Sequence, residues 1–390
     1  MFKRINHCDI YVGLWVIYML QGVIYSPGII NQFLQLVMLL WGLTAFFKYI
    51  NQSSMRRSSI LKATFILIIM YALYGCIHIM FGKRMISSNY VYLQSSLNSL
   101  IPIFLFYYFT YKGYLTSNRI RIYLPIFILT CILLYYKKEA SILLESNNEE
   151  ITNNIGYMFT SLIPLLFFYS KKPIFQYVLL GIILLFIFMG MKRGAILLGV
   201  VSSVLLLYVI LKESSRCLKL LTILLSVSII IGFFYYIDYL MTNSAYFVLR
   251  VEQTLEGNSS GRDILYGKLW DTLFQESNIF VILFGRGADS TIKIVGNYAH
   301  QDWLETFCNN GLLGVFILFL FFYSFGKSVL KSKRHFPTMM YYSFLILFVI
   351  TFSKSLISMS IQNLDLYQSL LIGYFAYKTV ESSQNLGKEI

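Results

Sequence analysis

A histidine stands where the one long polar stretch of this chain, 239–300, meets a hydrophobic segment. His300 lies in Asn297-Tyr-Ala-His-Gln-Asp-Trp-Leu-Glu305 and is one of only four histidines in 390 residues. An imidazole with a pKa of about 6.5 can accept a proton near neutral pH, as a general base must. The segment therefore points to proton-transfer chemistry at His300.

Basic side chains accompany this histidine. Arg262 and Arg286 belong to the polar stretch, while Lys192 and Arg193 lie in the turn Met189-Gly-Met-Lys-Arg-Gly194 between two apolar runs. The two cations of that turn either extend to the membrane interface or serve a bound anion. A base beside fixed cations suits chemistry on an anionic, lipid-linked substrate.

Two local patterns organise the polar stretch. Arg262 opens a predicted helix in which leucine recurs every fourth residue from Leu265 to Leu273. Arg286 lies between two glycines in Phe284-Gly-Arg-Gly287, where we expect the backbone to approach a ligand closely.

Nothing in the chain indicates a metal or nucleotide site. His300 has no histidine or cysteine partner at zinc-ligand spacing, and neither a Walker sequence nor a dinucleotide fingerprint occurs. We therefore expect no metal and no cofactor. The net charge of +14 is better explained as a membrane topology signal than by nucleic-acid binding.

The composition is that of a membrane protein. Hydrophobic residues make up 57% and charged residues 13% of the chain, whereas soluble domains carry about 25% charged residues. Because a backbone in lipid must satisfy its own hydrogen bonds and the alternation of barrel strands is absent, the apolar segments are expected to be helices. We predict an all-α, polytopic integral membrane protein with a single transmembrane domain, 1–390. The twelve expected spans are 9–26, 29–48, 60–81, 90–111, 121–137, 153–170, 173–191, 194–211, 218–238, 303–325, 339–358 and 363–379.

Charge placement orients these spans. Most of the 32 basic residues flank segments that lie on one side when the N-terminus is placed in the cytoplasm, as the positive-inside rule requires. Both termini are therefore expected in the cytoplasm and the polar stretch outside. Lys354 is expected at the outer end of its span, solvated.

These features resemble the O-antigen polymerase and ligase superfamily. The likeness rests on the many spans, the Lys-Arg-Gly turn, and an outward loop that contains Ser260-Gly-Arg262 and Phe284-Gly-Arg-Gly287. Ala299-His-Gln-Asp-Trp-Leu-Glu305, followed by Gly311-Leu-Leu-Gly314, adds to it. In that family the histidine is usually followed by asparagine, whereas this chain has glutamine there.

The resemblance implies a glycosyltransferase of the GT-C class in the bacterial inner membrane. Its donor is an oligosaccharide on undecaprenyl diphosphate, and it works without a metal ion. His300 would take the proton of the acceptor hydroxyl, and direct displacement would invert the anomeric centre. Asp302 or Glu305 would support the imidazolium, and the sequence does not choose between them.

The same resemblance assigns the diphosphate. Arg193 and Arg262 match the positions expected to hold it, with Arg286 as a third and Lys192 in support. Guanidinium groups suit this role because they bind phosphate oxygens in bidentate fashion and stay protonated.

Three functions are open. A polymerase transfers the glycan onto another lipid-linked repeat unit, and a ligase transfers it onto lipid A–core; we favour the polymerase. Its expected partners are the lipid-linked oligosaccharide and the bilayer, together with a chain-length regulator and a flippase. The alternative of a different class is a polysaccharide flippase or secondary transporter. The single asymmetric loop and the absence of matching halves argue against it.

Overall fold

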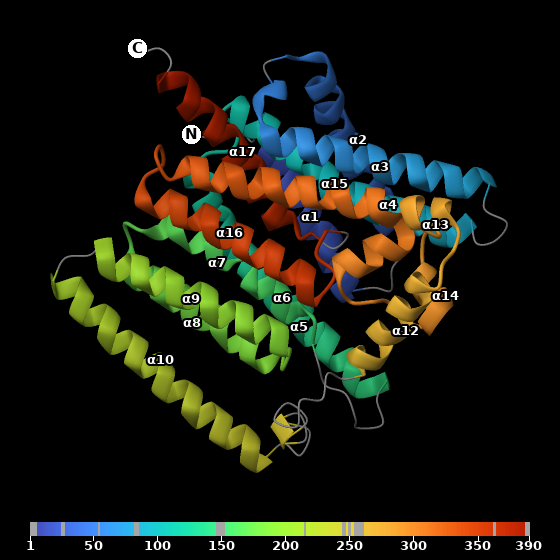
Figure 1. Cartoon of the computed structure of the whole chain (residues 1–390). Coiled ribbons are helices and arrows are strands. Elements are labelled where there is room, and N and C mark those ends of the chain that lie inside the picture. The colour runs from blue at the N-terminus through green and yellow to red at the C-terminus, as the bar shows by residue number, and fades with distance from the viewer. Residues whose placement is uncertain are drawn as a thin grey trace.

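All secondary structure in the described part of the chain is helical, as predicted (Figure 1). This computed structural model describes residues 6–24, 28–53, 55–81, 86–145, 153–213, 216–243, 247–248, 251–252, 261–361 and 364–386. The long helices are α1 (His7–Ile24), α2 (Ile29–Asn51), α3 (Ser59–Phe81), α4 (Ile86–Tyr111), α5 (Ser117–Glu145), α8 (Pro173–Met189), α9 (Arg193–Glu213), α10 (Arg216–Asn243), α15 (Asp302–Ser332), α16 (Thr338–Ile357) and α17 (Leu366–Leu386). The short ones are η1 (Met55–Arg57), α6 (Ile155–Thr160), α7 (Ile163–Leu166), η2 (Phe167–Tyr169), α12 (Arg262–Phe274), α13 (Ile279–Phe284) and α14 (Ser290–Val295).

Several of these helices can cross a membrane. Among the described residues, seven are long and apolar enough, and two shorter apolar stretches, Ile155–Tyr169 and Pro173–Met189, accompany them. The protein is therefore a helical membrane protein. Helical structure occurs in each of the twelve predicted spans, but their number stays a prediction because only seven helices meet the requirement.

The predicted span 153–170 is not one continuous helix. It is divided into α6, α7 and η2, and Pro164 stands at the start of α7. The Pro164 carbonyl accepts a hydrogen bond from the Ser343 hydroxyl (2.7 Å), and the Leu166 carbonyl accepts one from the Gln176 amide (3.1 Å). The pieces are packed among α5, α8, α9 and α16. Irregular backbone is tolerated at membrane depth in such surroundings, because protein groups replace the missing helical bonds.

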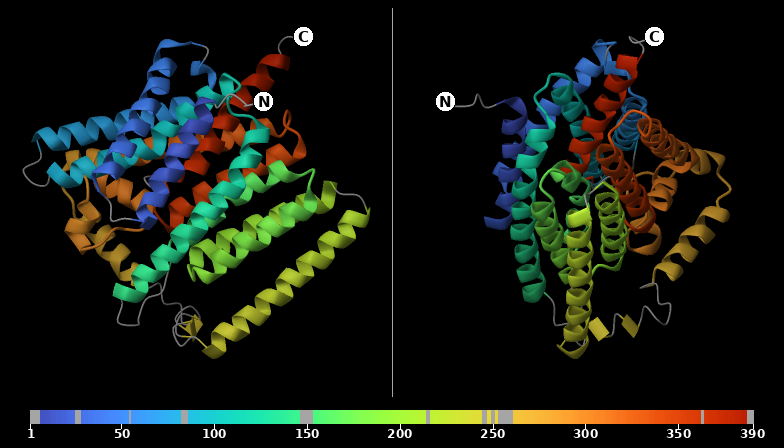
Figure 2. Two further views of the ribbon diagram at one scale, coloured as in Figure 1. Left: turned by 180° about the vertical axis from the view of Figure 1, so that it is seen from behind. Right: turned by 90° about the vertical axis from the view of Figure 1, so that its left-hand side faces the viewer.

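The connections between helices gather at two ends of the bundle. At one end the Ser59 and Ser328 hydroxyls are 3.0 Å apart, and the Asn6 side chain donates to the Tyr114 carbonyl (2.9 Å). Helix α1 begins and α17 ends there (Figure 1), whereas α12, α13 and α14 lie towards the other end, as the view from behind also shows (Figure 2). The start of α1 and the end of α17 thus lie at the same end of the bundle, and the orientation of that end in a membrane stays a prediction.

Helix α4 lies at the centre of one half of the bundle, where it packs against α2, α3 and α17. Its buried rings include Phe104, Phe106 and Phe109. Helix α10 lies at the edge of the bundle, packs mainly against α9 (Figures 1 and 2), and leaves apolar side chains such as Phe234 exposed. Such a surface suits contact with lipid.

Candidate functional site

The short helices of the polar stretch pack on the first part of α15, and we call this group (α12–α14 with 302–310) the polar lobe. Helix α12 begins at Arg262, as predicted. Its leucine pattern forms a packing face, since Leu269 is buried against Ala299, Leu304 and Cys308. This packing brings the helix that carries Arg262 against the segment that carries the histidine.

Arg262 links the polar lobe to the membrane helices. Its guanidinium Nη1 donates a hydrogen bond to the carbonyl of Ile357, the last residue of α16, at 2.9 Å. Carbonyls in the last turn of a helix lack intrahelical partners and carry partial negative charge, so a cation is stabilised there. One of the five N–H donors of the guanidinium is used in this bond.

The Lys-Arg-Gly turn (192–194) also lies at the end of α16, next to Ile357. Met191 has a left-handed backbone (φ 48°) and precedes Lys192. A β-carbon on Gly194 would lie 2.2 Å from the Tyr157 hydroxyl and 2.9 Å from Cδ1 of Ile357. Only glycine allows α9 to begin so close to α6 and to the end of α16.

His300 is half-buried and has a left-handed backbone (φ 52°), which is uncommon for a residue other than glycine. Its ring has no hydrogen-bond partner among the side chains and backbone groups that the structure describes. Burial, followed by the positive charges of Arg262 and Lys192, lowers the pKa of the imidazole below its ordinary value. The structure therefore brings together three of the predicted site residues from separate parts of the chain.

Glu305 fixes the backbone just before the histidine. Its carboxylate is buried and accepts hydrogen bonds from the Ala299 N–H (2.9 Å), the Thr291 hydroxyl (2.8 Å) and the Asn309 amide (3.1 Å). The bond to Ala299 fixes the backbone directly before His300, the residue with the left-handed conformation.

Asp302 fixes the backbone just after it. Its carboxylate accepts bonds from the N–H groups of Ser360 (2.8 Å) and Ile361 (3.0 Å), and the neighbouring Trp303 indole donates to the Ser355 hydroxyl (3.1 Å). The start of α15 is thus tied to the turn between α16 and α17. Neither carboxylate bonds to the imidazole in the described contacts, and both position it through the backbone.

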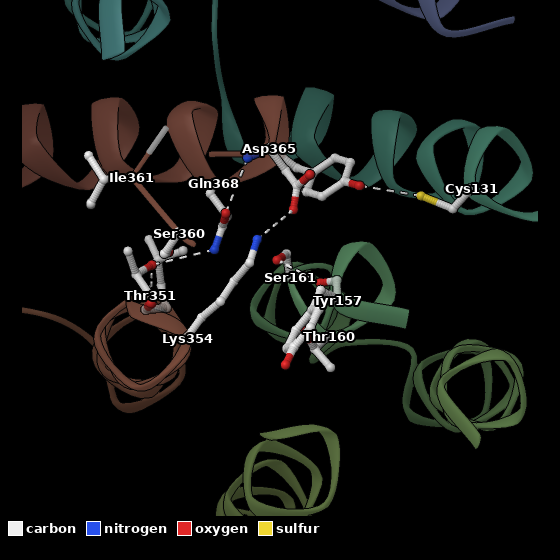
Figure 3. A network of polar contacts seen from close by, with 12 residues as sticks. Cys131, Tyr157, Thr160, Ser161, Thr351, Lys354, Ser360, Ile361, Asp365 and Gln368 are labelled. Atoms are coloured by element: carbon white, nitrogen blue, oxygen red, sulfur yellow. Dashed lines mark hydrogen bonds and ion pairs between the residues drawn. The ribbon is translucent and has the colours of Figure 1, made fainter. Parts of the chain in front are cut away.

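Lys354 was expected to be solvated, and this expectation is wrong. Lys354 is 5% exposed and forms an ion pair with Asp365 across the turn between α16 and α17 (3.9 Å). Figure 3 shows the lysine directed towards this carboxylate. Its Nζ is also 5.6 Å from the centre of the Tyr157 ring. Gln368 completes the network, since its side-chain oxygen Oε1 accepts a hydrogen bond from the Asp365 backbone N–H (3.2 Å). The sequence offered only a lysine in the last turn of an apolar helix, with an aspartate eleven residues further along.

Arg286 lies in a different environment. Its guanidinium is paired with Glu276 at 2.5 Å, and its charge is not among those that act on His300. The adjacent Gly285 was expected to approach a ligand, but a β-carbon there would lie 2.4 Å from the backbone of α15. Gly285 therefore serves close packing against α15, at its kink at Gly311 (φ 67°). Arg193, at the start of α9, is exposed.

A cavity of about 340 Å³ lies between α1, α2, α4 and the start of α17. Its walls include Trp15, Tyr18, Gln35, Asn98 and Asp365. Its volume is at the lower end of the range for small-molecule sites, about 300–1,000 Å³. Aromatic faces, carboxamides and a carboxylate together suit a ligand that carries both hydroxyl groups and apolar ring faces.

Comparison with known proteins gives no assignment, since no family model and no curated protein matches this chain. In the described part of the chain, no group of three His, Cys, Asp or Glu side chains could hold a metal ion. The arrangement of His300, Arg262 and Lys192 allows two kinds of chemistry. The neutral imidazole of His300 can accept a proton, and the cations beside it can stabilise negative charge.

Proposed function

We propose that this chain is a polysaccharide polymerase of the O-antigen polymerase type. It would transfer an oligosaccharide from undecaprenyl diphosphate onto a lipid-linked repeat unit. The observation that carries the proposal is the meeting of Lys192, Arg262 and His300, which come from three separate segments and lie at one end of a membrane bundle. A base beside fixed cations is what transfer of a sugar away from a diphosphate requires.

The reaction would run as a direct displacement. The acceptor hydroxyl oxygen attacks the anomeric carbon as its proton passes to His300, and the bond from that carbon to the diphosphate oxygen breaks. The diphosphate leaves with the bonding electron pair, so negative charge grows next to Lys192 and Arg262. The lowered pKa of His300 favours the neutral imidazole near pH 7, which is the form that can act as a base. The anomeric centre is inverted.

Arg193 and Arg262 are the proposed diphosphate ligands. Arg262 keeps N–H donors beyond the one bound to Ile357, and Arg193 adjoins Lys192 at the start of α9. Arg286 would first have to leave Glu276, so we place it third. Lys192 adds positive charge, and Asp302 and Glu305 hold the backbone on either side of the base.

The orientation follows from charge. We propose a GT-C-type protein with twelve spans in the bacterial inner membrane and both termini in the cytoplasm. In support, α1 begins and α17 ends at the same end of the bundle (Figure 1). That end also carries most of the basic connections, as the positive-inside rule requires. The polar lobe then faces outward, where lipid-linked repeat units are joined.

The cavity beside Asp365 supports a glycan acceptor, as the proposed polymerase requires. Trp15, Asn98 and Asp365 offer contacts suited to a sugar of the acceptor, and Asp365 connects through Lys354 and Tyr157 to the region of Arg262. A glycan fits this chemistry because it carries both hydroxyl groups and apolar ring faces.

One observation favours a carrier as the second candidate. The segment 155–169 is a broken helix, and discontinuous helices line the binding sites of secondary transporters. A carrier or flippase would move lipid-linked glycan across the bilayer without lengthening it.

Reconstitution in vesicles separates these functions. We would supply the full chain with lipid-linked oligosaccharide and neither nucleotide nor metal. A polymerase gives longer glycans and releases undecaprenyl diphosphate, whereas a ligase gives product only when lipid A–core is added. Movement of the donor across the bilayer without any new glycosidic bond would establish the carrier and exclude the transferase.

A further inference from the structure

A second cavity lies at the end of the bundle away from His300, where η1, α3, α15 and α17 meet. Its volume is about 180 Å³. The residues that line it are Arg57, Ser58, Ser59, Ser328, Lys331, Thr379, Val380, Ser383 and Gln384. They come from three separate parts of the chain, and none of them is acidic.

The cavity is positively charged. Arg57 and Lys331 are both exposed, and neither forms an ion pair with an acidic side chain of the described residues. The nearby acidic residue of α17, Glu381, is already bound to Lys378 at 2.6 Å. Two cations therefore line one small space that no acidic side chain lines.

Polar groups of the backbone and side chains add to this field. Helix α3 begins at Ser59, beside the cavity, and the first N–H groups of a helix are unpaired and carry partial positive charge. The Ser59 hydroxyl is bonded to that of Ser328 (3.0 Å), which itself donates to the Ser324 carbonyl (2.8 Å). Ser59 is thus the donor in this pair, and rotation of its hydroxyl would direct the proton into the cavity.

Apolar surface continues beside the charges. Leu330, next to Lys331 on α15, is 70% exposed, and α15 is one of the helices able to cross the membrane. A ligand that places an anionic group in the cavity can therefore lay hydrocarbon along α15. Basic pockets between membrane helices bind anionic lipid headgroups in this manner.

We infer that this cavity binds the phosphate of an anionic phospholipid headgroup. Arg57 and Lys331 contact the phosphate oxygens from two sides, and the Ser59 hydroxyl donates to a third oxygen. The acyl chains run along the exposed face of α15. This site is separate from the proposed glycosyl transfer and does not depend on it.

Native mass spectrometry of the purified full chain measures this binding. The probes are phosphatidylglycerol, zwitterionic phosphatidylcholine and inorganic phosphate, each added to protein in a neutral detergent. We expect one tightly retained phosphatidylglycerol, weaker binding of phosphatidylcholine, and no competition by inorganic phosphate at millimolar concentration. Equal retention of the two lipids, or displacement of phosphatidylglycerol by inorganic phosphate, would overturn the assignment to an anionic lipid.

A matched pair of variants tests the location. Arg57→Gln/Lys331→Gln removes the two cations of the cavity, and Arg56→Gln/Lys327→Gln removes two neighbouring cations that do not line it. The first should weaken phosphatidylglycerol binding at least about tenfold and the second about twofold or less. Equal losses of phosphatidylglycerol binding in the two double variants would show that binding depends only on the overall positive charge of this end of the bundle.

A third variant tests the cavity itself. Ser383→Phe fills the space and leaves every charge in place, so it should also lose the bound lipid. Retention of the lipid by Ser383→Phe would place the headgroup elsewhere on this end of the bundle.

Discussion

Lys354 and Asp365 form an ion pair across the turn that joins α16 to α17, with Nζ and Oδ2 3.9 Å apart and both side chains largely buried. The same turn donates two backbone N–H groups to Asp302, and α16 ends at the carbonyl that holds Arg262. The pair therefore fixes the turn against which His300 and Arg262 of the candidate site are held.

The first prediction concerns the stability of this pair. Lys354→Met or Asp365→Asn alone leaves a buried charge without its partner, which costs about 3–5 kcal/mol. The double variant removes both charges and should recover most of that loss. Chemical unfolding in detergent measures all three proteins, and additive losses in the double variant would show that the two side chains do not act as a pair.

His300 is expected to be the general base. His300→Ala should lower glycan extension about 100- to 10,000-fold, the usual contribution of such a group. His300→Gln keeps hydrogen-bonding capacity but cannot accept a proton, so it should be as inactive as His300→Ala. Donor binding and membrane insertion should be unchanged in both. Normal extension by His300→Gln would assign the imidazole a structural role.

The pH dependence follows from the cations beside this histidine. Because burial and the charges of Arg262 and Lys192 lower the pKa of His300, activity should persist below the ordinary imidazole range and decline only as pH falls through the lowered value. Removing one charge with Lys192→Gln should raise the pKa and move this decline to higher pH. The rate profile of Lys293→Gln, a lysine of the polar lobe that binds the Ala288 carbonyl, should not move. Identical shifts in the two variants would contradict the geometry.

The arginines should act through shape as well as charge. Arg262→Lys keeps the charge but loses the planar fork, and the loss of one charge-assisted hydrogen bond should lower extension roughly 10- to 100-fold. Arg193→Lys should behave in the same way. Protein level and insertion serve as controls, and near-normal polymer from both lysine variants would leave only a diffuse electrostatic role.

Gly194 offers a purely steric test. In Gly194→Ala the new methyl group would meet the Tyr157 hydroxyl at 2.2 Å, and overpacking of this kind costs about 1–3 kcal/mol. Tyr157→Phe removes that oxygen and should restore part of the stability of Gly194→Ala. Gly181→Ala on α8, where no atom lies within 4 Å of the added carbon, should be neutral. Thermal unfolding distinguishes these cases, and a harmless Gly194→Ala would contradict the close approach of α9 to α6.

The elements of this fold were largely predictable because their causes are local. Apolar length decides where a membrane helix forms, and the leucine spacing after Arg262 predicted α12 from its first residue. The break in 153–170 had a signal in Pro164, but the Ser343 and Gln176 side chains that make it tolerable come from other helices.

The candidate site was predictable in part. His300, Arg262 and Lys192 stood out by type and position, and the structure brings them together. The pairing of Lys354 with Asp365 depends on how a turn folds back, and the partners of Asp302 lie nearly sixty residues away. Sequence spacing carries no information about such contacts, because they are set by the packing of α15 against the end of α16.

The kink at Gly311 has a mechanical consequence. The carbonyls of Cys308 and Asn309 accept hydrogen bonds from the backbone N–H groups of Arg286 and Gly287 (2.9 and 3.0 Å). The first part of α15 is thereby bound to the turn that follows α13, and one glycine with a positive φ (67°) joins it to the rest of the helix. The His300 imidazole is thus attached to the polar lobe, whereas the Lys-Arg-Gly turn belongs to the membrane bundle. A rotation at Gly311 would pull the imidazole away from that turn only if the bonds of Arg262 to Ile357 and of Asp302 to Ser360 and Ile361 broke, so the arrangement of the candidate site would depend on how the lobe is seated.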